Sequence, residues 1–393
     1  MERVGPPCGS FERDRSEDMR VCMLSSADVD QPYGSTIRPL HMGKHLVRLG
    51  VEVLHICEQP PRHEDGLESL CLRDFADRSE EELFRIILAR CRRFSPDVIY
   101  SHQVFMGSRF GRRLSRLVNR PHVFDAHSSM AQEVPTYHHL TFTGKVWLIL
   151  NEMILLHSAH RVIAPSIELR ESFVKVYRAS RKKIQIVKNG VETERFRPGP
   201  ADSRLRNSLG IPPGVPVILF TNPRLHTFPS NEMALHALFR MMPEIERRVP
   251  EIRCLILGGG PVLARPSKNV IYAGFVEDLV AHINLADICL APFPPDAICG
   301  GTRNKVCEYL ACGKPIVATC EGMRGFDDAI PGEHYLLGEE GIGFIERLVQ
   351  CIYDQGMAEQ IGRNARRLSR HYDSRYLAGQ LDSLFHEVTR SPC

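Results

Sequence analysis

Short apolar runs alternate with amphipathic stretches along most of the chain. Apolar runs bounded by turn-forming residues predict buried strands of a parallel sheet, and apolar positions spaced by three and four predict helices. In the first half, the predicted strands are 20–24, 51–57, 96–100, 122–124, 161–164 and 184–187. The predicted helices there are 36–49, 80–94, 105–118, 147–159 and 167–177, and residues 60–78 are expected to form a polar, irregular connection. This order indicates a parallel, doubly wound sheet.

The same order begins again after a charged, proline-rich stretch. The later predicted strands are 217–221, 253–257, 270–272, 288–291 and 316–318, and the later predicted helices are 231–242, 279–286, 344–353, 357–372 and 375–389. We therefore predict an α/β protein built from two Rossmann-like doubly wound domains that face a central cleft, where the carboxyl ends of both sheets meet. The predicted parts are a disordered leader (1–18), an N-terminal domain (19–195), a linker (196–214), a C-terminal domain (215–372) and a C-terminal helix (373–393) that packs back on the N-terminal domain.

The composition of the chain limits the classes of protein to which it can belong. The chain is 43% hydrophobic and 25% charged, as in soluble globular proteins, and its net charge of +3 gives no reason to expect a nucleic-acid partner. Its 13 cysteines are scattered without CxxC pairs, so we expect reduced thiols, no metal site and a cytoplasmic protein. The most apolar run, 146–156, is too short to span a membrane and is interrupted by Asn151 and Glu152.

Residues 299–319 contain the densest group of candidate functional residues. Gly301 and Thr302 open a loop, and a short helix is expected to follow and to end at Gly313. Free N–H groups at the start of that helix, together with the helix dipole, make an anion site. Arg303 and Lys305 add positive charge there, and Glu308 is an acceptor suited to sugar hydroxyls.

Four segments give the chain a resemblance to a known family. They are 159–166 (AHRVIAPS), 186–198 (IVKNGVETERFRP), 255–261 with 269–279 (LILGGGP and NVIYAGFVEDL), and 300–319. The chain resembles the retaining glycosyltransferases of family 4, the group 1 glycosyl transferases, which have the GT-B fold. The resemblance implies a nucleoside-diphosphate-sugar donor, UDP- or GDP-linked, held mainly by the C-terminal domain (the nucleotide-sugar domain). It also implies a hydroxyl acceptor on a glycan, a lipid-linked molecule or a small molecule, held mainly by the N-terminal domain (the acceptor domain). It implies no metal and no further cofactor.

The resemblance also implies roles for single residues. Glu308 would accept hydrogen bonds from the ribose hydroxyls, and His127 would contact the transferred sugar. Arg224 and Lys305 would neutralise the leaving diphosphate. The remaining candidates for binding the donor nucleotide or its phosphates are Gly34, Gly259, Phe275, Val276, Gly301, Thr302 and Arg303.

Two departures from the family pattern leave other interpretations open. Gly300 stands where the family often has an acidic residue, and no lysine closely follows Arg224. A sugar-nucleotide epimerase or hydrolase of the same fold, or a non-catalytic sugar-nucleotide-binding subunit, therefore remains an alternative. The basic helix from Arg109 to Arg120 is either a solvated face or a contact with anionic lipid at the inner membrane face.

Overall fold

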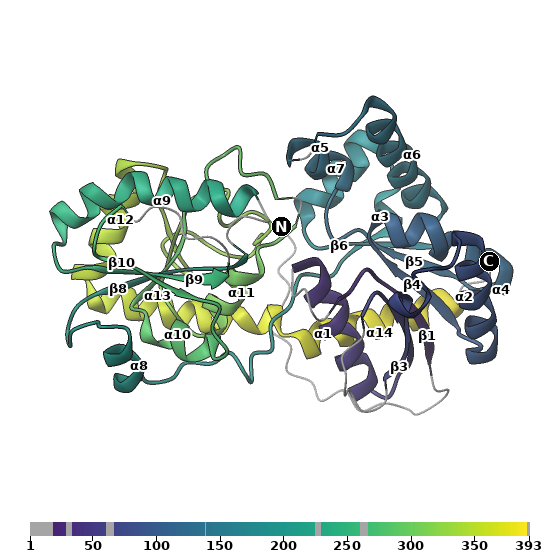
Figure 1. The fold of residues 1–393 in the computed structure, drawn as a ribbon, viewed down its shortest axis with the longest axis horizontal. Coiled ribbons are helices and arrows are strands. Elements are labelled where there is room, and N and C mark those ends of the chain that lie inside the picture. The colour runs from purple at the N-terminus through teal and green to yellow at the C-terminus, as the bar shows by residue number, and fades with distance from the viewer. Residues whose placement is uncertain are drawn as a thin grey trace.

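The computed structural model describes residues 19–28, 34–59, 67–137, 139–224, 229–259, 266–299 and 301–390. They form two α/β domains joined side by side (Figure 1). The predicted leader, 1–18, lies outside the described residues.

The N-terminal domain has a seven-stranded parallel sheet in the order β3-β2-β1-β4-β5-β6-β7. Its strands are β1 (Arg20–Leu24), β2 (Glu52–Cys57), β3 (Leu67–Cys71), β4 (Val98–His102), β5 (His122–Asp125), β6 (Arg161–Ala164) and β7 (Ile184–Ile186). Its helices are α1 (Gly34–Arg48), α2 (Glu80–Phe94), α3 (Gln103–Met106), α4 (Arg112–Val118), α5 (Met130–Tyr137), α6 (Phe142–Ser158) and α7 (Ile167–Tyr177). β4 and β5 are buried throughout, and their apolar parts, 98–100 and 123–124, are the short apolar runs seen in the sequence.

The C-terminal domain has a six-stranded parallel sheet in the order β10-β9-β8-β11-β12-β13. Its strands are β8 (Val217–Arg224), β9 (Arg253–Gly259), β10 (Val270–Gly274), β11 (Ile288–Ala291), β12 (Ile316–Ala318) and β13 (Leu336–Leu337). The helices that follow β7 are α8 (Ser203–Ser208), α9 (Pro229–Arg248), α10 (Leu279–Leu285), α11 (Asn304–Ala311), α12 (Ile342–Tyr353), α13 (Gln355–Leu368) and α14 (Ser374–Arg390). The fold is therefore the α/β arrangement of two doubly wound parallel sheets that the sequence predicts.

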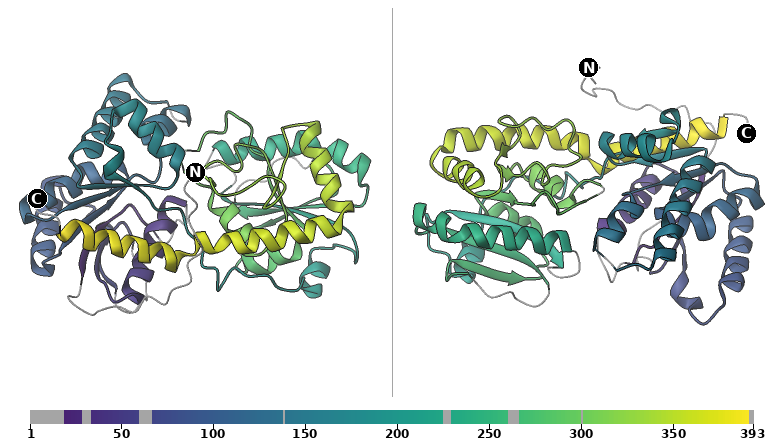
Figure 2. Two further views of the ribbon diagram at one scale, coloured as in Figure 1. Left: turned by 180° about the vertical axis from the view of Figure 1, so that it is seen from behind. Right: turned by 90° about the horizontal axis from the view of Figure 1, so that it is seen from above.

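The chain passes between the domains twice. The first passage follows β7, and the second leads from α13 into α14, which lies against the N-terminal domain (Figure 2). Leu377, Leu381 and Phe385 of α14 are buried in the same apolar cluster as residues of β1 and α1. The Phe385 ring meets the ring of Tyr100 edge-on at 5.3 Å. This packing ties the end of the chain to the first domain.

One local prediction is wrong. Residues 67–71, expected to be irregular, form the edge strand β3, and only one neighbouring strand pairs with it. An edge strand with one face in solvent lacks a continuous apolar run, so its sequence gives little signal. Residues 105–118 are helical as predicted, with a π-turn at Gly107–Gly111 between α3 and α4, and the predicted linker contains the short helix α8. Among the described residues, no helix is both long and apolar enough to cross a membrane.

Candidate functional site

The loop before α11 lies where the two domains touch. A Cβ atom at Gly301 would lie 2.6 Å from the carbonyl oxygen of His127 and 3.5 Å from Cγ of Pro165, both in the N-terminal domain. The Nδ2 amide of Asn189 donates to the carbonyl oxygen of Thr302 at 3.0 Å. The close backbone approach explains why position 301 is a glycine. The structure thus brings the predicted residues His127, Gly301 and Thr302 together.

Helix α11 is anchored from beneath by its apolar side. Val306, Tyr309 and Leu310 are buried, as their spacing predicts. The Tyr309 hydroxyl accepts a hydrogen bond from the backbone N–H of Thr221, in the second half of β8, at 2.9 Å. Gly313, just beyond the helix, has φ of +65°, the left-handed conformation expected of a glycine cap. The helix start is therefore held rigidly at the carboxyl edge of the second sheet.

Glu308 is a half-buried carboxyl group on this helix. No described residue donates a hydrogen bond to it. Burial raises its pKa to about 7, although the positive charges of Lys305 and Arg195 oppose the shift. A carboxyl group that lacks donors and titrates near neutrality is suited to accept hydrogen bonds from ligand hydroxyls.

Lys305 lies one turn before Glu308 and reaches toward α9. Its Nζ donates to Oδ1 of Asn231, near the start of that helix, at 3.0 Å, and lies 4.3 Å from the centre of the Phe220 ring. Burial lowers its pKa well below the usual lysine value, and the neighbouring Arg303 lowers it further. An anionic ligand beside Lys305 would therefore stabilise its protonated form.

Arg303 is buried in the protein rather than free in the loop. Its side chain donates to the backbone oxygen and to Oε1 of Glu321 at 3.2 and 3.1 Å, and to the backbone oxygen of Ala297 at 2.7 Å. The guanidinium also lies 3.4 Å from the centre of the Phe293 ring. In this structure Arg303 therefore stabilises the loop through buried contacts. The Thr302 hydroxyl, by contrast, is buried without a hydrogen-bond partner among the described residues.

His127 follows β5 and is held by a buried ion pair. Its backbone N–H donates to Oδ1 of Asp125 at 3.3 Å, and the Arg38 guanidinium lies 3.0 Å from Oδ2 of the same carboxylate. Tyr100 donates its hydroxyl to that oxygen at 2.7 Å. Burial, together with the charge of Arg38, lowers the pKa of His127 to about 4. The imidazole is thus neutral at pH 7, able to donate or accept one hydrogen bond at each nitrogen.

The sequence interpretation did not include Arg38. Its guanidinium also donates to the backbone oxygens of Val187 and Lys188, at 2.9 and 2.6 Å, and to Oδ1 of Asn189 at 3.0 Å. Arg38 therefore joins α1, the strand end that carries His127, and the asparagine that bonds the second domain. No local signal marks it, because its partners lie 87 to 151 residues away.

The other predicted residues lie at the ends of strands or helices. Gly34 is the first residue of α1. Arg224 ends β8 and pairs in register with Gly259, which ends β9. Phe275 follows β10 with 70% of its surface exposed, and Val276 packs against the core of the second domain. The Arg224 side chain, Gly300 and residues 225–228 lie outside the described residues. No contact in the described part joins Phe275 to α11.

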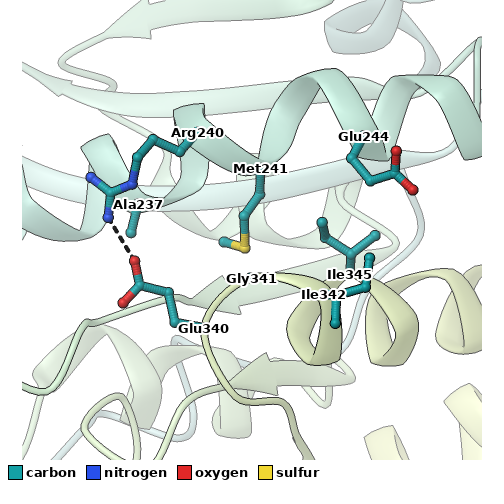
Figure 3. Close-up of a pocket in the computed structure, with 8 residues that line it drawn as sticks. All are labelled: Ala237, Arg240, Met241, Glu244, Glu340, Gly341, Ile342 and Ile345. Carbon is teal, nitrogen blue, oxygen red and sulfur yellow. Dashed lines mark hydrogen bonds and ion pairs between the residues drawn. The ribbon is translucent and has the colours of Figure 1, made fainter.

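A separate hollow of about 620 Å³ lies between α9 and the start of α12 (Figure 3). Its rim carries the ion pair between Arg240 and Glu340, at 2.6 Å, and Met241 lies between that pair and Ile345. None of the predicted site residues lines it. In the described ranges, no group of three or more histidine, cysteine, aspartate or glutamate residues is placed to hold a metal ion.

Comparisons with known proteins agree with this architecture. Residues 34–195 match the profile described as Glycosyltransferase Family 4, and residues 216–354 match the one described as Glycosyl transferases group 1. A D-inositol 3-phosphate glycosyltransferase from Streptomyces bingchenggensis is 25% identical over 239 residues, covering 55% of this chain. The alignment covers only about half of that curated relative, 50% of its length.

Two solved structures share the fold. Sucrose-phosphate synthase from Thermosynechococcus elongatus superposes with a TM-score of 0.74 at 17% identity, over 94% of this chain and 98% of that one. HepE from Anabaena, solved in complex with UDP-glucose, superposes with a TM-score of 0.72 at 17% identity, over 94% and 100%. With the two family profiles covering most of both domains, the chain belongs to the group 1 glycosyl transferases of family 4 and has their two-domain GT-B fold.

Proposed function

We propose that this protein transfers a sugar from a UDP- or GDP-sugar to a hydroxyl acceptor and retains the anomeric configuration. The observation that supports this most is Glu308, a carboxyl group beside Lys305 that has no hydrogen-bond donor among the described residues. Family membership supports the reaction class, and the UDP-glucose complex of HepE supports this kind of donor.

The donor would bind along the start of α11. The helix dipole and the N–H groups at the helix start favour a diphosphate there, and a bound diphosphate would favour the protonated, positively charged form of Lys305. Charge develops on the diphosphate as the glycosidic bond breaks, so groups that are already in place lower the barrier. Glu308, one turn further along, would accept hydrogen bonds from the ribose hydroxyls.

The acceptor and the transferred sugar would bind on the N-terminal side. His127, neutral at pH 7, would hydrogen-bond a hydroxyl of the transferred sugar. In the proposed step, the bond between the anomeric carbon and the phosphate oxygen breaks, and a bond to the acceptor oxygen forms on the same face. The leaving phosphate takes the acceptor proton, so no protein nucleophile or metal takes part.

The acceptor class is a polar hydroxyl compound: a glycan, a lipid-linked molecule or a small molecule. The Streptomyces relative is named for an inositol phosphate acceptor, so D-inositol 3-phosphate belongs in the first acceptor panel.

Binding of the donor can be tested with a thermal-shift screen of UDP-, GDP-, ADP- and TDP-sugars, because a ligand that binds only the folded state raises Tm. We expect a UDP- or GDP-sugar to raise Tm and Glu308→Gln to reduce donor affinity about tenfold or more. Glu346→Gln, which changes an exposed glutamate on α12, is the matched control. Wild-type affinity in Glu308→Gln would contradict the site. Donor turnover without any acceptor product would favour an epimerase or hydrolase, and binding without turnover would favour a non-catalytic subunit.

A further inference from the structure

Helix α6 exposes an apolar face at the outer surface of the N-terminal domain. Six of its large apolar side chains are exposed, and the most exposed, Phe142, has 81% of its surface accessible; the six are Phe142, Val146, Trp147, Ile149, Leu150 and Ile154. Leu148, Leu155 and Leu156, on the other side, are buried. A helix that is apolar all round is normally enclosed by protein or lipid. Figure 1 shows α6 grouped with α5 and α7, on the opposite side of the domain from α1 and α14.

The apolar face continues onto neighbouring elements. The Phe105 ring of α3, 40% exposed, stacks on the Trp147 ring with centroids 5.7 Å apart and planes inclined by 21°. Val176 of α7, which packs beside α6, is also exposed. Contiguous apolar surface of this kind marks an interaction site rather than scattered surface residues.

No acidic group interrupts this face. Glu152 is the only acidic residue of α6, and it is fully buried. It accepts hydrogen bonds from the hydroxyls of Ser129 and Tyr177 at 2.9 and 2.6 Å, and from the backbone N–H of Met130 at 2.9 Å. The one exposed charge on α6 is that of Lys145.

Basic residues border the face at the carboxyl end of α6. The Lys183 side chain donates to the backbone oxygens of His157 and Ala159, at 2.9 and 3.2 Å, which fixes the 178–183 segment beside that end. Lys175, Arg178 and Lys182 are exposed and form no ion pair with the described residues. The border is therefore strongly positive.

We propose that the apolar face of α6, with this basic border, docks on the surface of a lipid bilayer that contains anionic lipids. Aromatic and aliphatic side chains would enter the region between headgroups and acyl chains, while the lysines would contact anionic headgroups. Charge complementarity favours an anionic membrane over a second copy of this chain, because the same face of a second copy offers no acidic group to meet the basic border.

This surface differs from the basic helix that the sequence suggested. Arg109 and Arg113 of that stretch form ion pairs with Glu80 and Glu81 of α2, at 3.3 and 2.8 Å, so part of its charge is already balanced. The α6 face also has a direct link to the candidate site. Glu152 holds the backbone N–H of Met130, three residues after His127. Docking through α6 would therefore place the acceptor side of the site at the membrane, whatever donor it uses.

Vesicle co-sedimentation of the full chain tests the proposal. Wild-type protein should sediment with phosphatidylcholine vesicles that contain phosphatidylglycerol. The double change Ile149→Glu with Leu150→Glu should weaken this binding by about tenfold or more, since it places two charges in the apolar contact. The double change Lys175→Glu with Lys182→Glu should weaken vesicle binding about tenfold, because it replaces two cations that would contact anionic headgroups. Ile330→Glu, at an exposed apolar site of the second domain, is the control and should bind as the wild type does.

Three outcomes would overturn the proposal. The first is wild-type protein that stays in the supernatant with the vesicles that contain phosphatidylglycerol. The second is unchanged binding of the Ile149→Glu, Leu150→Glu variant, which would assign binding to another surface. The third is a wild-type dimer that this variant dissociates, which would assign the face to a second copy. Circular dichroism melts of each variant, and donor binding by thermal shift, separate these outcomes from misfolding and from failure of the proposed function.

Discussion

Replacing Gly301 by alanine tests whether the contact between the two domains positions the reaction. The added methyl carbon would lie 2.6 Å from the backbone oxygen of His127. An ordinary carbon–oxygen contact is about 3.3 to 3.6 Å, so the loop and the first domain must separate by about 0.7 Å or more. The obstacle is a backbone carbonyl next to a strand end, which cannot rotate away as a side chain could.

The displacement has a measurable size. It would stretch the hydrogen bond from Asn189 to the Thr302 carbonyl, now 3.0 Å long. Overpacking of this kind costs about 1–3 kcal/mol when it cannot relax. Here the domains can relax by moving apart, so the effect should appear in alignment of the reacting groups, where about 1 Å is worth about a hundredfold in rate.

We therefore expect Gly301→Ala to lower kcat/KM for sugar transfer by about 10- to 100-fold. Donor affinity should stay within about threefold of wild type, because the proposed donor contacts on α11 belong to one domain. Gly379→Ala on α14, where an added Cβ meets no atom within 4 Å, is the matched control. Steady-state kinetics and calorimetric titration with the donor separate the two quantities. A kcat/KM within twofold of wild type would refute the reasoning.

Two further changes test single groups. Burial raises the pKa of Glu308 from 4.5 to about 7, so between these pH values the folded state keeps a proton that the unfolded state has lost. The contribution of this group to stability is fully present below pH 4.5 and is lost as the pH rises to 7. Glu308→Gln should remove this dependence, giving a higher ligand-free Tm than wild type at pH 8; parallel pH profiles of Tm would contradict the assignment. Glu321→Ala leaves the Arg303 guanidinium buried without its carboxylate and should lower the free energy of unfolding in urea by about 3 kcal/mol. A loss below about 0.5 kcal/mol, as expected for Glu346→Ala on the surface, would show that the pair contributes nothing.

Much of the fold can be read from local patterns. Fully buried strands such as β11 and β12 appear as apolar runs, and glycine caps mark helix ends such as that of α11. The edge strand β3 and the two-residue β13 could not be predicted, because they have too little buried surface to leave a pattern.

The candidate site was predictable where chemistry is local and unpredictable where it depends on distant partners. Glu308 and Lys305 follow from their place in the α11 segment. Arg303 looks identical in sequence to a free cation, yet its charge is balanced by Glu321, 18 residues later. The ion pair of Arg38 and Asp125 joins residues that are 87 positions apart, and no local sequence pattern predicts it. Likewise, the apolar pattern of α6 is typical of a core helix, and only the structure shows that one face is uncovered.

The central claim is retaining sugar transfer from a nucleoside-diphosphate sugar bound along α11. The most direct measurement is the anomeric configuration of the first-formed product, determined by NMR in reactions of the wild type and of Glu308→Gln with the donor that raises Tm. The account predicts a product with the anomeric configuration of the donor and a rate that falls about tenfold or more in Glu308→Gln. An inverted product, or equal rates for the two proteins, would contradict it.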